Sequence, residues 1–125
     1  MKLKSAAGIV CYVKDVKKTV KFYQALGFTF KKNKPDHATG YINWFWIDFL
    51  QSSKEKKSGF KDDANAKHKG DGLYLYLSVD DVDKAYKDLK AKKFTPSEPK
   101  DWAWGNREFV IRDPDGYKLV VFKRI

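Results

Sequence analysis

An internal repeat constrains the fold of this chain more than any other feature of its sequence. The segments 13–30 and 79–96 align at a constant offset of 66 residues without a gap, and eight of the eighteen aligned positions are identical. Such a repeat means that one supersecondary unit is used more than once. Two copies of about 60 residues predict a pair of half-domains, because a solenoid needs at least three repeats to bury a continuous core.

Each copy begins with a predicted strand. Residues 72–79 alternate strictly, with leucines on one face and Tyr74 and Tyr76 on the other, whereas residues 7–13 alternate less cleanly in the same register. A period of two is typical of a sheet strand whose two faces differ in role. We expect the leucine face to meet a helix, which leaves the tyrosine face free to line a cavity.

A helix is predicted after each of these strands. Asp15 and Asp81 stand at the N-cap positions, and Gly27 follows the first apolar stripe as the expected C-terminal glycine. The D-P-D-G sequence at 113–116 is a strong turn signal. Further strands are predicted over residues 28–34, 41–51 (as two short strands or one bent strand), 108–112 and 118–122.

These elements predict an α+β fold in which two tandem β-α-β-β-β modules form a curved mixed sheet around a cup. The length predicts a single domain over residues 1–125. Module 1 is expected to cover about 1–52 and module 2 about 72–125. The polar, Lys-rich segment 53–71 has no periodicity, which is typical of a linker or a lid, and Phe60 is the large apolar residue that could fold over a site.

The formal net charge of +10 is only weak evidence for nucleic-acid binding. Only three of the 26 basic residues are arginines, and the lysines are scattered among Asp and Glu. Nucleic-acid-binding surfaces favour clustered, arginine-rich stripes. The sequence has no 18-residue apolar run and no signal-peptide pattern, so we expect a cytoplasmic protein that binds neither a membrane nor a specific nucleic acid.

Four spaced motifs resemble those of a known family. The V-x-D, F-Y and L-G-F motifs within residues 13–28 and the closing R-D-P-D-G-Y-K-L of 112–119 are similar to those of the vicinal oxygen chelate superfamily. Its members include glyoxalase I, extradiol dioxygenases, fosfomycin-resistance enzymes and bleomycin-resistance proteins. The resemblance covers nearly the whole chain outside residues 52–71 and implies the duplicated β-α-β-β-β fold, whereas the function varies within such a fold.

The resemblance also implies where a catalytic metal would be held. Enzymes of the superfamily use a His on the first strand of each half and a Glu on the last strand. The matching positions here are Gly8, Tyr74 and Val120. Because none of these side chains is a suitable donor for a divalent metal of this kind, we expect no metal, no other cofactor and no catalytic residue at these positions.

The sequence W-A-W-G-N-R-E-F at 102–109 looks like the W-G-x-R-E-F signature of the bleomycin-resistance group. Members of that group bind a drug without a catalytic metal, in grooves between two subunits. The alternative is that Trp104 packs at a strand entry and that Arg107 and Glu108 are ordinary strand residues. A charge of +10 repels a cationic glycopeptide, so bleomycin itself is not the expected ligand.

An acidic residue on the last strand of the first half completes the candidate site. Aligning residues 47–50 with 119–122 places Asp48 at the position of Val120, directed inward, whereas a slip of one residue would direct it outward. The candidate ligand-binding residues are Trp44, Trp46, Asp48, Tyr74, Tyr76, Trp102, Trp104, Arg107 and Phe122.

These residues favour a metal-free small-molecule binding protein over an enzyme. The aromatic set suits a planar or aromatic ligand, drug-like or metabolic and not strongly cationic, which the protein would sequester. The alternative is a metal-dependent lyase, isomerase or dioxygenase of the same superfamily with relocated ligands. A third interpretation is a basic module that binds nucleic acid weakly through its lysines.

A homodimer with the cups at or near the interface is expected, because each half leaves open sheet edges and family members commonly form twofold dimers. Light scattering across the micromolar range should therefore give twice the mass of one chain. A constant mass of a single chain would contradict this prediction.

Overall fold

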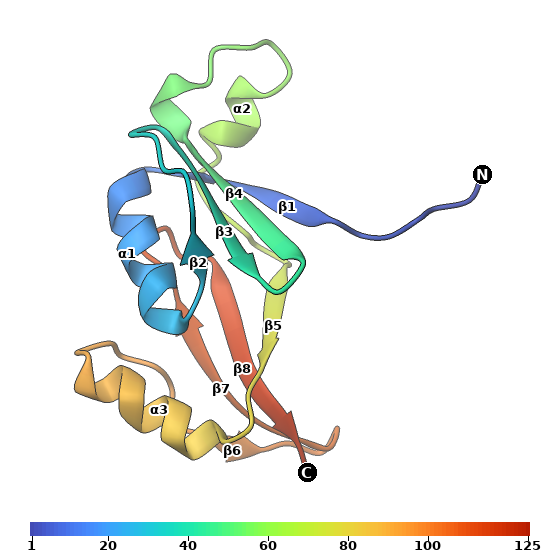
Figure 1. The fold of residues 1–125 in the computed structure, drawn as a ribbon, viewed down its shortest axis with the longest axis vertical. Coiled ribbons are helices and arrows are strands. Elements are labelled where there is room, and N and C mark those ends of the chain that lie inside the picture. Colours follow the sequence, from blue (N-terminus) through green and yellow to red (C-terminus); the bar gives the residue numbers. More distant parts are fainter. The chain divides into compact units, whose positions relative to one another are not determined.

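The computed structural model describes all 125 residues, and they divide into two compact units, Met1–Lys67 and His68–Ile125. We call these units module 1 and module 2. Module 1 contains β1 (Gly8–Val13), α1 (Val16–Leu26), β2 (Thr29–Phe30), β3 (His37–Ile42) and β4 (Phe45–Gln51). Module 2 repeats this order with β5 (Tyr74–Ser78), α3 (Val82–Ala91), β6 (Lys100–Asp101), β7 (Asn106–Arg112) and β8 (Lys118–Arg124) (Figure 1). The predicted α+β fold with two β-α-β-β-β modules is confirmed.

Each module forms one four-stranded mixed sheet. The strand order is β1-β4-β3-β2 in module 1 and β5-β8-β7-β6 in module 2. In both sheets the first strand pairs in parallel with the last, and the remaining pairs are antiparallel. In each module the helix follows the first strand and leads to the second strand at the opposite edge of the sheet, so the helix crosses one face of the sheet.

Both helices begin at the predicted aspartates. The side chain of Asp15 accepts a hydrogen bond from the backbone N–H of Lys18 at 3.2 Å, and that of Asp81 accepts one from Lys84 at 3.0 Å. Gly27 ends α1 with a left-handed φ of 108°, and the backbone N–H groups of Gly27 and Phe28 bond back to the last turn. These are the local side-chain and backbone contacts that the sequence predicts.

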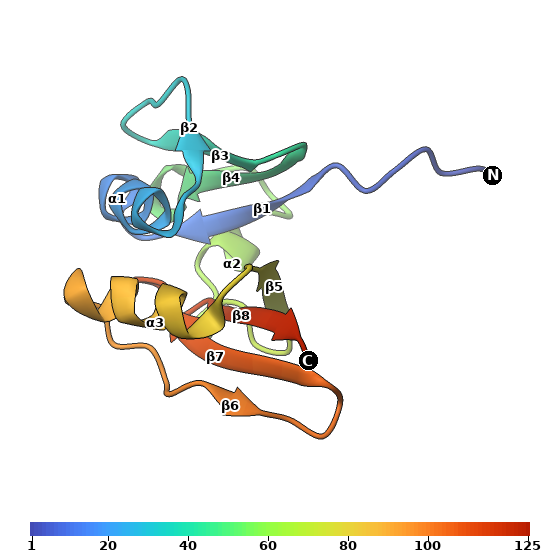
Figure 2. The ribbon, with the colours of Figure 1, turned by 60° about the horizontal axis from the view of Figure 1, so that its bottom comes forward.

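Each helix covers one face of its own sheet (Figure 2). In module 1, Tyr23 of α1 contacts Phe49 of β4 with ring centroids 4.6 Å apart, and both rings are buried. In module 2, Tyr86 of α3 contacts Phe109 of β7, beside the buried Leu119 of β8. The helix-side core of module 2 is therefore centred on β7 and β8, while the leucines of β5 are only half-buried beside it.

Two predicted segments differ from the structure. The predicted strand 28–34 pairs only over Thr29–Phe30, since Lys31–Asn33 leave β3 before the chain rejoins it at an isolated Lys34–His37 bridge. The segment 53–71 is not a structureless linker. It begins within a 3-10 turn, η1 (Ser52–Lys54), and contains a short helix, α2 (Lys61–Ala64).

The chain after β4 packs onto module 1. The hydroxyl of Ser52 donates to the backbone carbonyl of Val13 at 3.0 Å, and Ala64 of α2 is fully buried close to β1. The proposed lid residue, Phe60, is 53% exposed and precedes α2. None of the helices reaches the length and apolar character that crossing a bilayer requires.

The two aspartate caps allow a matched test of helix stability. We expect Asp15→Ala and Asp81→Ala each to lower the free energy of unfolding by about 1 kcal/mol, because one backbone N–H loses its acceptor. Asp80→Ala is the control, since Asp80 is exposed beside the cap. Chemical denaturation followed by circular dichroism measures all three variants, and an equal loss in Asp80→Ala would contradict the capping role of Asp81.

Candidate functional site

Each sheet has an open face, which we define as the face opposite its helix. Strand alternation puts Trp46, Asp48 and Leu50 on the open face of module 1, because Ile47 and Phe49 between them are buried on the helix side. In module 2 the same alternation puts Tyr74, Tyr76 and Phe122 on the open face, together with Val120. The predicted orientation of Asp48 toward this face agrees with the register.

The register also confirms the alignment of the two last strands. Val10 of β1 lies opposite Asp48 of β4, and Tyr76 of β5 lies opposite Val120 of β8. Val10 and Tyr76 are related by the repeat offset of 66 residues. Asp48 is therefore the module 1 counterpart of Val120.

The first-strand position in module 1 has no room for a histidine. A Cβ atom built on Gly8 would overlap the indole ring and the backbone carbonyl of Trp46, the residue opposite it in β4. In module 2 the equivalent position holds the phenol of Tyr74, which interacts with Lys118. These residues do not fit a divalent cation, which needs imidazole or carboxylate donors. Elsewhere too, no three His, Cys, Asp or Glu side chains form a group that could hold a metal ion.

Aromatic side chains gather on the open face of module 2. Tyr74 and Tyr76 are 55% and 43% exposed, and Tyr76 makes an edge contact with the ring of Phe122. Trp102 and Trp104 follow β6 and stack on each other, with centroids 4.6 Å apart and ring planes within 10°. We refer to these five residues as the aromatic face. It collects five of the nine predicted site residues.

The tight turn between β6 and β7 makes the stacking of the two indoles possible. The backbone N–H of Gly105 donates to the carbonyl of Trp102, and that of Trp102 donates to the carbonyl of Asn106. Gly105 adopts a left-handed φ of 91°, which favours glycine. The indoles, two residues apart on this turn, therefore lie parallel.

The buried Glu108 joins the aromatic face, a role that the sequence did not reveal. Its carboxylate is 5% exposed and accepts hydrogen bonds from Trp104 Nε1 and Asn106 Nδ2, both at 2.9 Å. The Tyr76 hydroxyl donates to its other oxygen at 3.5 Å. Burial and the neighbouring carboxylate raise the pKa of Tyr76. Alternation with the buried Phe109 is the signal that could have placed Glu108 on the open face.

Arg107 does not join the aromatic face. Strand alternation directs it away from Glu108, and its guanidinium forms a bidentate pair with Asp83 of α3 at 2.9 and 3.2 Å and a bond to Asp101 at 3.0 Å. Hydrogen bonding to Arg107 lowers the pKa of Asp83. With both carboxylates engaged, Arg107 is placed to tie helix α3 to strand β6.

The remaining predicted residues lie in module 1. Trp44 is 69% exposed in the turn between β3 and β4, whereas Trp46 is half-buried over Gly8. Asp48 accepts a hydrogen bond from the Thr39 hydroxyl at 2.5 Å, and its Oδ1 lies 3.5 Å from His37 Nε2. His37 therefore reaches the same open face as Asp48.

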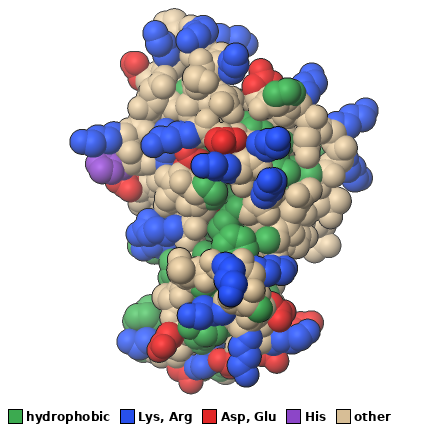
Figure 3. Space-filling model, turned by 90° about the vertical axis from the view of Figure 1, so that its left-hand side faces the viewer, with side chains coloured by type: hydrophobic (Ala, Val, Ile, Leu, Met, Phe, Trp, Pro, Cys, Tyr) green, Lys and Arg blue, Asp and Glu red, His purple; other side chains and the backbone are tan.

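The face drawn in Figure 3 shows no single basic stripe. On the face drawn in Figure 3, Lys and Arg side chains are spread among Asp and Glu side chains, with apolar groups between them. The lysines form cation–π contacts at several separate rings, such as Lys100 over Trp102 at 4.2 Å and Lys118 over Tyr74 at 4.5 Å. The positive charge of this face is thus distributed.

Comparison with known proteins agrees with this architecture. The sequence profile of the Glyoxalase/Bleomycin resistance protein/Dioxygenase superfamily matches residues 6–121. No curated protein matches the chain. Many solved structures share the fold, including the following three.

The first is a glyoxalase/bleomycin resistance protein/dioxygenase from Nocardioides, 20% identical with a TM-score of 0.83 over 100% of this chain and 86% of that one. The second is TnmS3, an antibiotic binding protein from Streptomyces sp. CB03234, 20% identical with a TM-score of 0.75 over 100% and 99%. The third is a lactoylglutathione lyase from Agrobacterium tumefaciens, 16% identical with a TM-score of 0.70 over 98% and 95%.

The Tyr76–Glu108 pair predicts a pH-dependent signature of the aromatic face. In Glu108→Gln the pKa of Tyr76 should fall, because the phenolate no longer forms beside a carboxylate. It should stay above the ordinary value for tyrosine, because burial of the hydroxyl still disfavours the phenolate. Glu55→Gln is the matched control, because Glu55 similarly raises the pKa of Tyr12 on module 1. Carbon-13 NMR of labelled tyrosines measures both titrations. A Tyr76 titration unchanged by Glu108→Gln would contradict the pairing.

Proposed function

Since the chain belongs to the Glyoxalase/Bleomycin resistance protein/Dioxygenase superfamily, we propose that it is a small-molecule binding protein that sequesters a planar or aromatic ligand on the aromatic face of module 2. The exposure of that face carries the proposal. Four large aromatic side chains on it are between 38% and 58% exposed, and α3 covers the opposite face of the sheet. Large exposed apolar groups of this kind mark ligand or partner sites.

The indole pair supplies a preformed stacking surface. Trp104 covers one face of Trp102, and the ammonium of Lys100 lies over the Trp102 ring 4.2 Å from its centroid, so both faces of Trp102 are engaged. Trp104 remains 58% exposed, and its Nε1–H is held by Glu108. An indole whose orientation is already set loses little conformational freedom when a flat ligand stacks on it. Trp104 is thus the proposed anchor.

Charge on the aromatic face favours a neutral or anionic ligand. Glu108 already accepts three hydrogen bonds, which leaves its carboxylate little capacity for a cationic group of the ligand. Lys100 and Lys118 place ammonium groups beside Trp102 and Tyr74. The chain's net charge of +10 also attracts anions over a longer range. An aromatic ring bearing a carboxylate or sulfonate combines both features.

Sequestration without a metal is the form of binding that we propose. TnmS3, which shares the fold, is an antibiotic binding protein, and the residues at Gly8, Tyr74 and Val120 lack the donors that a divalent metal requires. A metal-dependent enzyme would need ligands recruited from elsewhere, and the His37–Asp48 pair supplies only two. Elemental analysis that found a stoichiometric metal after dialysis would contradict the metal-free form of the proposal.

Tryptophan fluorescence tests the binding proposal directly. A planar aromatic sulfonate such as 1-naphthalenesulfonate should quench the fluorescence, and Trp104→Ala should weaken its binding by about 1–3 kcal/mol if Trp104 is a stacking anchor. Trp44→Ala is the matched control, because Trp44 is a similarly exposed indole in a turn of module 1. We expect its affinity to be unchanged.

Two outcomes would overturn this assignment. An unchanged affinity in Trp104→Ala would show that the indole only packs at the strand entry. Tighter binding of a planar cation of the same size, such as 1-naphthylmethylammonium, would contradict the proposed charge preference.

A further inference from the structure

We propose that module 1 carries a separate binding site for a doubly charged oxyanion such as phosphate, in a hollow between the lysines of residues 31–34 and strand β3. The hollow has a volume of about 440 Å³ and is lined by Lys31, Lys32, Lys34, His37, Thr39 and Tyr41. It lies outside the aromatic face and does not depend on the function proposed above.

The hollow originates in a gap between two strands. Pairing of β2 with β3 ends at Phe30 opposite Gly40, and the chain pairs with β3 again only at the Lys34–His37 bridge. The backbone N–H of Lys34 donates to the carbonyl of His37 at 2.8 Å, which closes the far end. Residues between these two points bow away from β3, and the hollow opens there.

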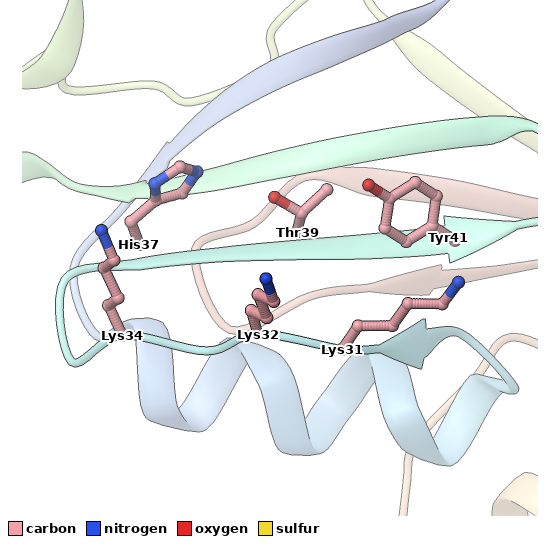
Figure 4. A pocket seen from close by; sticks show the side chains of 6 residues that line it. All are labelled: Lys31, Lys32, Lys34, His37, Thr39 and Tyr41. Carbon is pink, nitrogen blue, oxygen red and sulfur yellow. The ribbon is translucent and has the colours of Figure 1, made fainter.

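The lining side chains face one another across this gap (Figure 4). The side chain of Lys34 ends near His37, that of Lys32 points toward Thr39, and that of Lys31 points toward Tyr41. The ammonium of Lys31 lies 5.7 Å from the centroid of the Tyr41 ring. Three ammonium groups from one short segment are therefore directed at a single strand.

The polar groups of the hollow are incompletely satisfied. None of the three lysines forms an ion pair with a carboxylate, and the Tyr41 hydroxyl has no hydrogen-bond partner. His37 Nε2 is buried and also lacks one, because its 3.5 Å approach to Asp48 does not have hydrogen-bond geometry. Lys31, Lys32 and Lys34 are exposed, so the general rule that buried polar atoms are paired applies here to His37 Nε2, which lies beside the hollow without a partner.

An oxyanion satisfies these groups together. Three neighbouring ammonium groups repel one another, and an anion bound between them offsets this repulsion because it attracts each ammonium group. Lysine binds phosphate as a point charge through up to three N–H donors, and a phosphate has enough oxygens to accept from several lysines and from the Tyr41 hydroxyl. A carboxylate carries half the charge and fewer acceptors, which is why we assign a doubly charged oxyanion.

The negative charge of Asp48 repels an anion in the hollow, so a variant without that charge provides a further test. The Asp48 carboxylate holds the Thr39 hydroxyl at 2.5 Å, so the Thr39 proton is directed to Asp48 and away from the hollow. The three lysines outnumber this single negative charge. Removing the charge in the isosteric Asp48→Asn should make phosphate bind more tightly.

The experiment is a phosphate titration of the isotope-labelled full chain at constant ionic strength, followed by amide NMR. Saturable shifts are expected over residues 31–41. The triple variant Lys31→Gln, Lys32→Gln, Lys34→Gln should weaken the apparent affinity about tenfold or more, because several charge-assisted hydrogen bonds are lost. Acetate at the same ionic strength should bind more weakly than phosphate.

The matched control removes the same charge from the same module. Lys17, Lys18 and Lys21 are exposed on α1, and their triple substitution by Gln should leave the affinity within about twofold if only the general field changes. Tyr41→Phe keeps every charge and should weaken phosphate binding on its own, which tests the site independently of the lysine variants. Trp104→Ala should have no effect, which separates this site from the aromatic face.

Three outcomes would overturn the proposal. The first is an equal loss in the two lysine triples, because it would show that phosphate responds only to net charge. The second is equal binding of acetate and phosphate, because it would remove the doubly charged specificity. The third is the absence of saturable shifts over residues 31–41 in the unmodified chain.

Discussion

The parallel pairing of the first strand with the last strand in each module is the constraint on which the rest of the structure depends. It places β4 between β1 and β3, and β8 between β5 and β7. It also leaves β1 and β2, and likewise β5 and β6, at opposite edges of their sheets, so the chain must cross one face of the sheet between them, and α1 and α3 provide that crossover. The covered face becomes the core, as the nearly complete burial of Phe49 and Leu119 indicates.

The same constraint leaves the second face of each sheet opposite the crossover helix. Strand alternation sends every other side chain of the central strands to this face, opposite α1 in module 1 and α3 in module 2. The register brings Trp46 over Gly8 in module 1 and Lys118 beside Tyr74 in module 2, although Gly8 and Tyr74 are equivalent positions of the repeat. One scaffold thus presents two chemically different surfaces, basic and polar in module 1 and aromatic in module 2.

The identities between the two copies follow this division. Val16 and Val82 begin the two helices and are buried, and Asp15 and Asp81 cap them. On the open faces, by contrast, Asp48 of one copy corresponds to Val120 of the other. Packing a helix on a sheet imposes the same requirements twice, whereas residues of the open faces do not pack against that helix and are free to differ between the modules.

The sequence by itself determined the features that depend on local contacts. The N-caps, the left-handed Gly27 and the 113–116 turn all form within four residues, and the alternation of 72–79 correctly separated Tyr74 and Tyr76 from the leucines. The placement of Tyr74, Tyr76 and Phe122 on the open face was predictable for the same reason, because parity along a strand assigns a face without knowledge of its neighbours.

Only the tertiary structure decided which partners these residues meet. Arg107 and Glu108 are adjacent in one motif, yet their partners are distant in sequence. Arg107 pairs with Asp83, 24 residues away, and Glu108 accepts a hydrogen bond from the hydroxyl of Tyr76, 32 residues away. The early end of β2, which opens the lysine-lined hollow, likewise depends on where the chain rejoins β3. Such contacts form between segments distant in sequence, and their geometry is set by strand pairing, which local propensity does not determine.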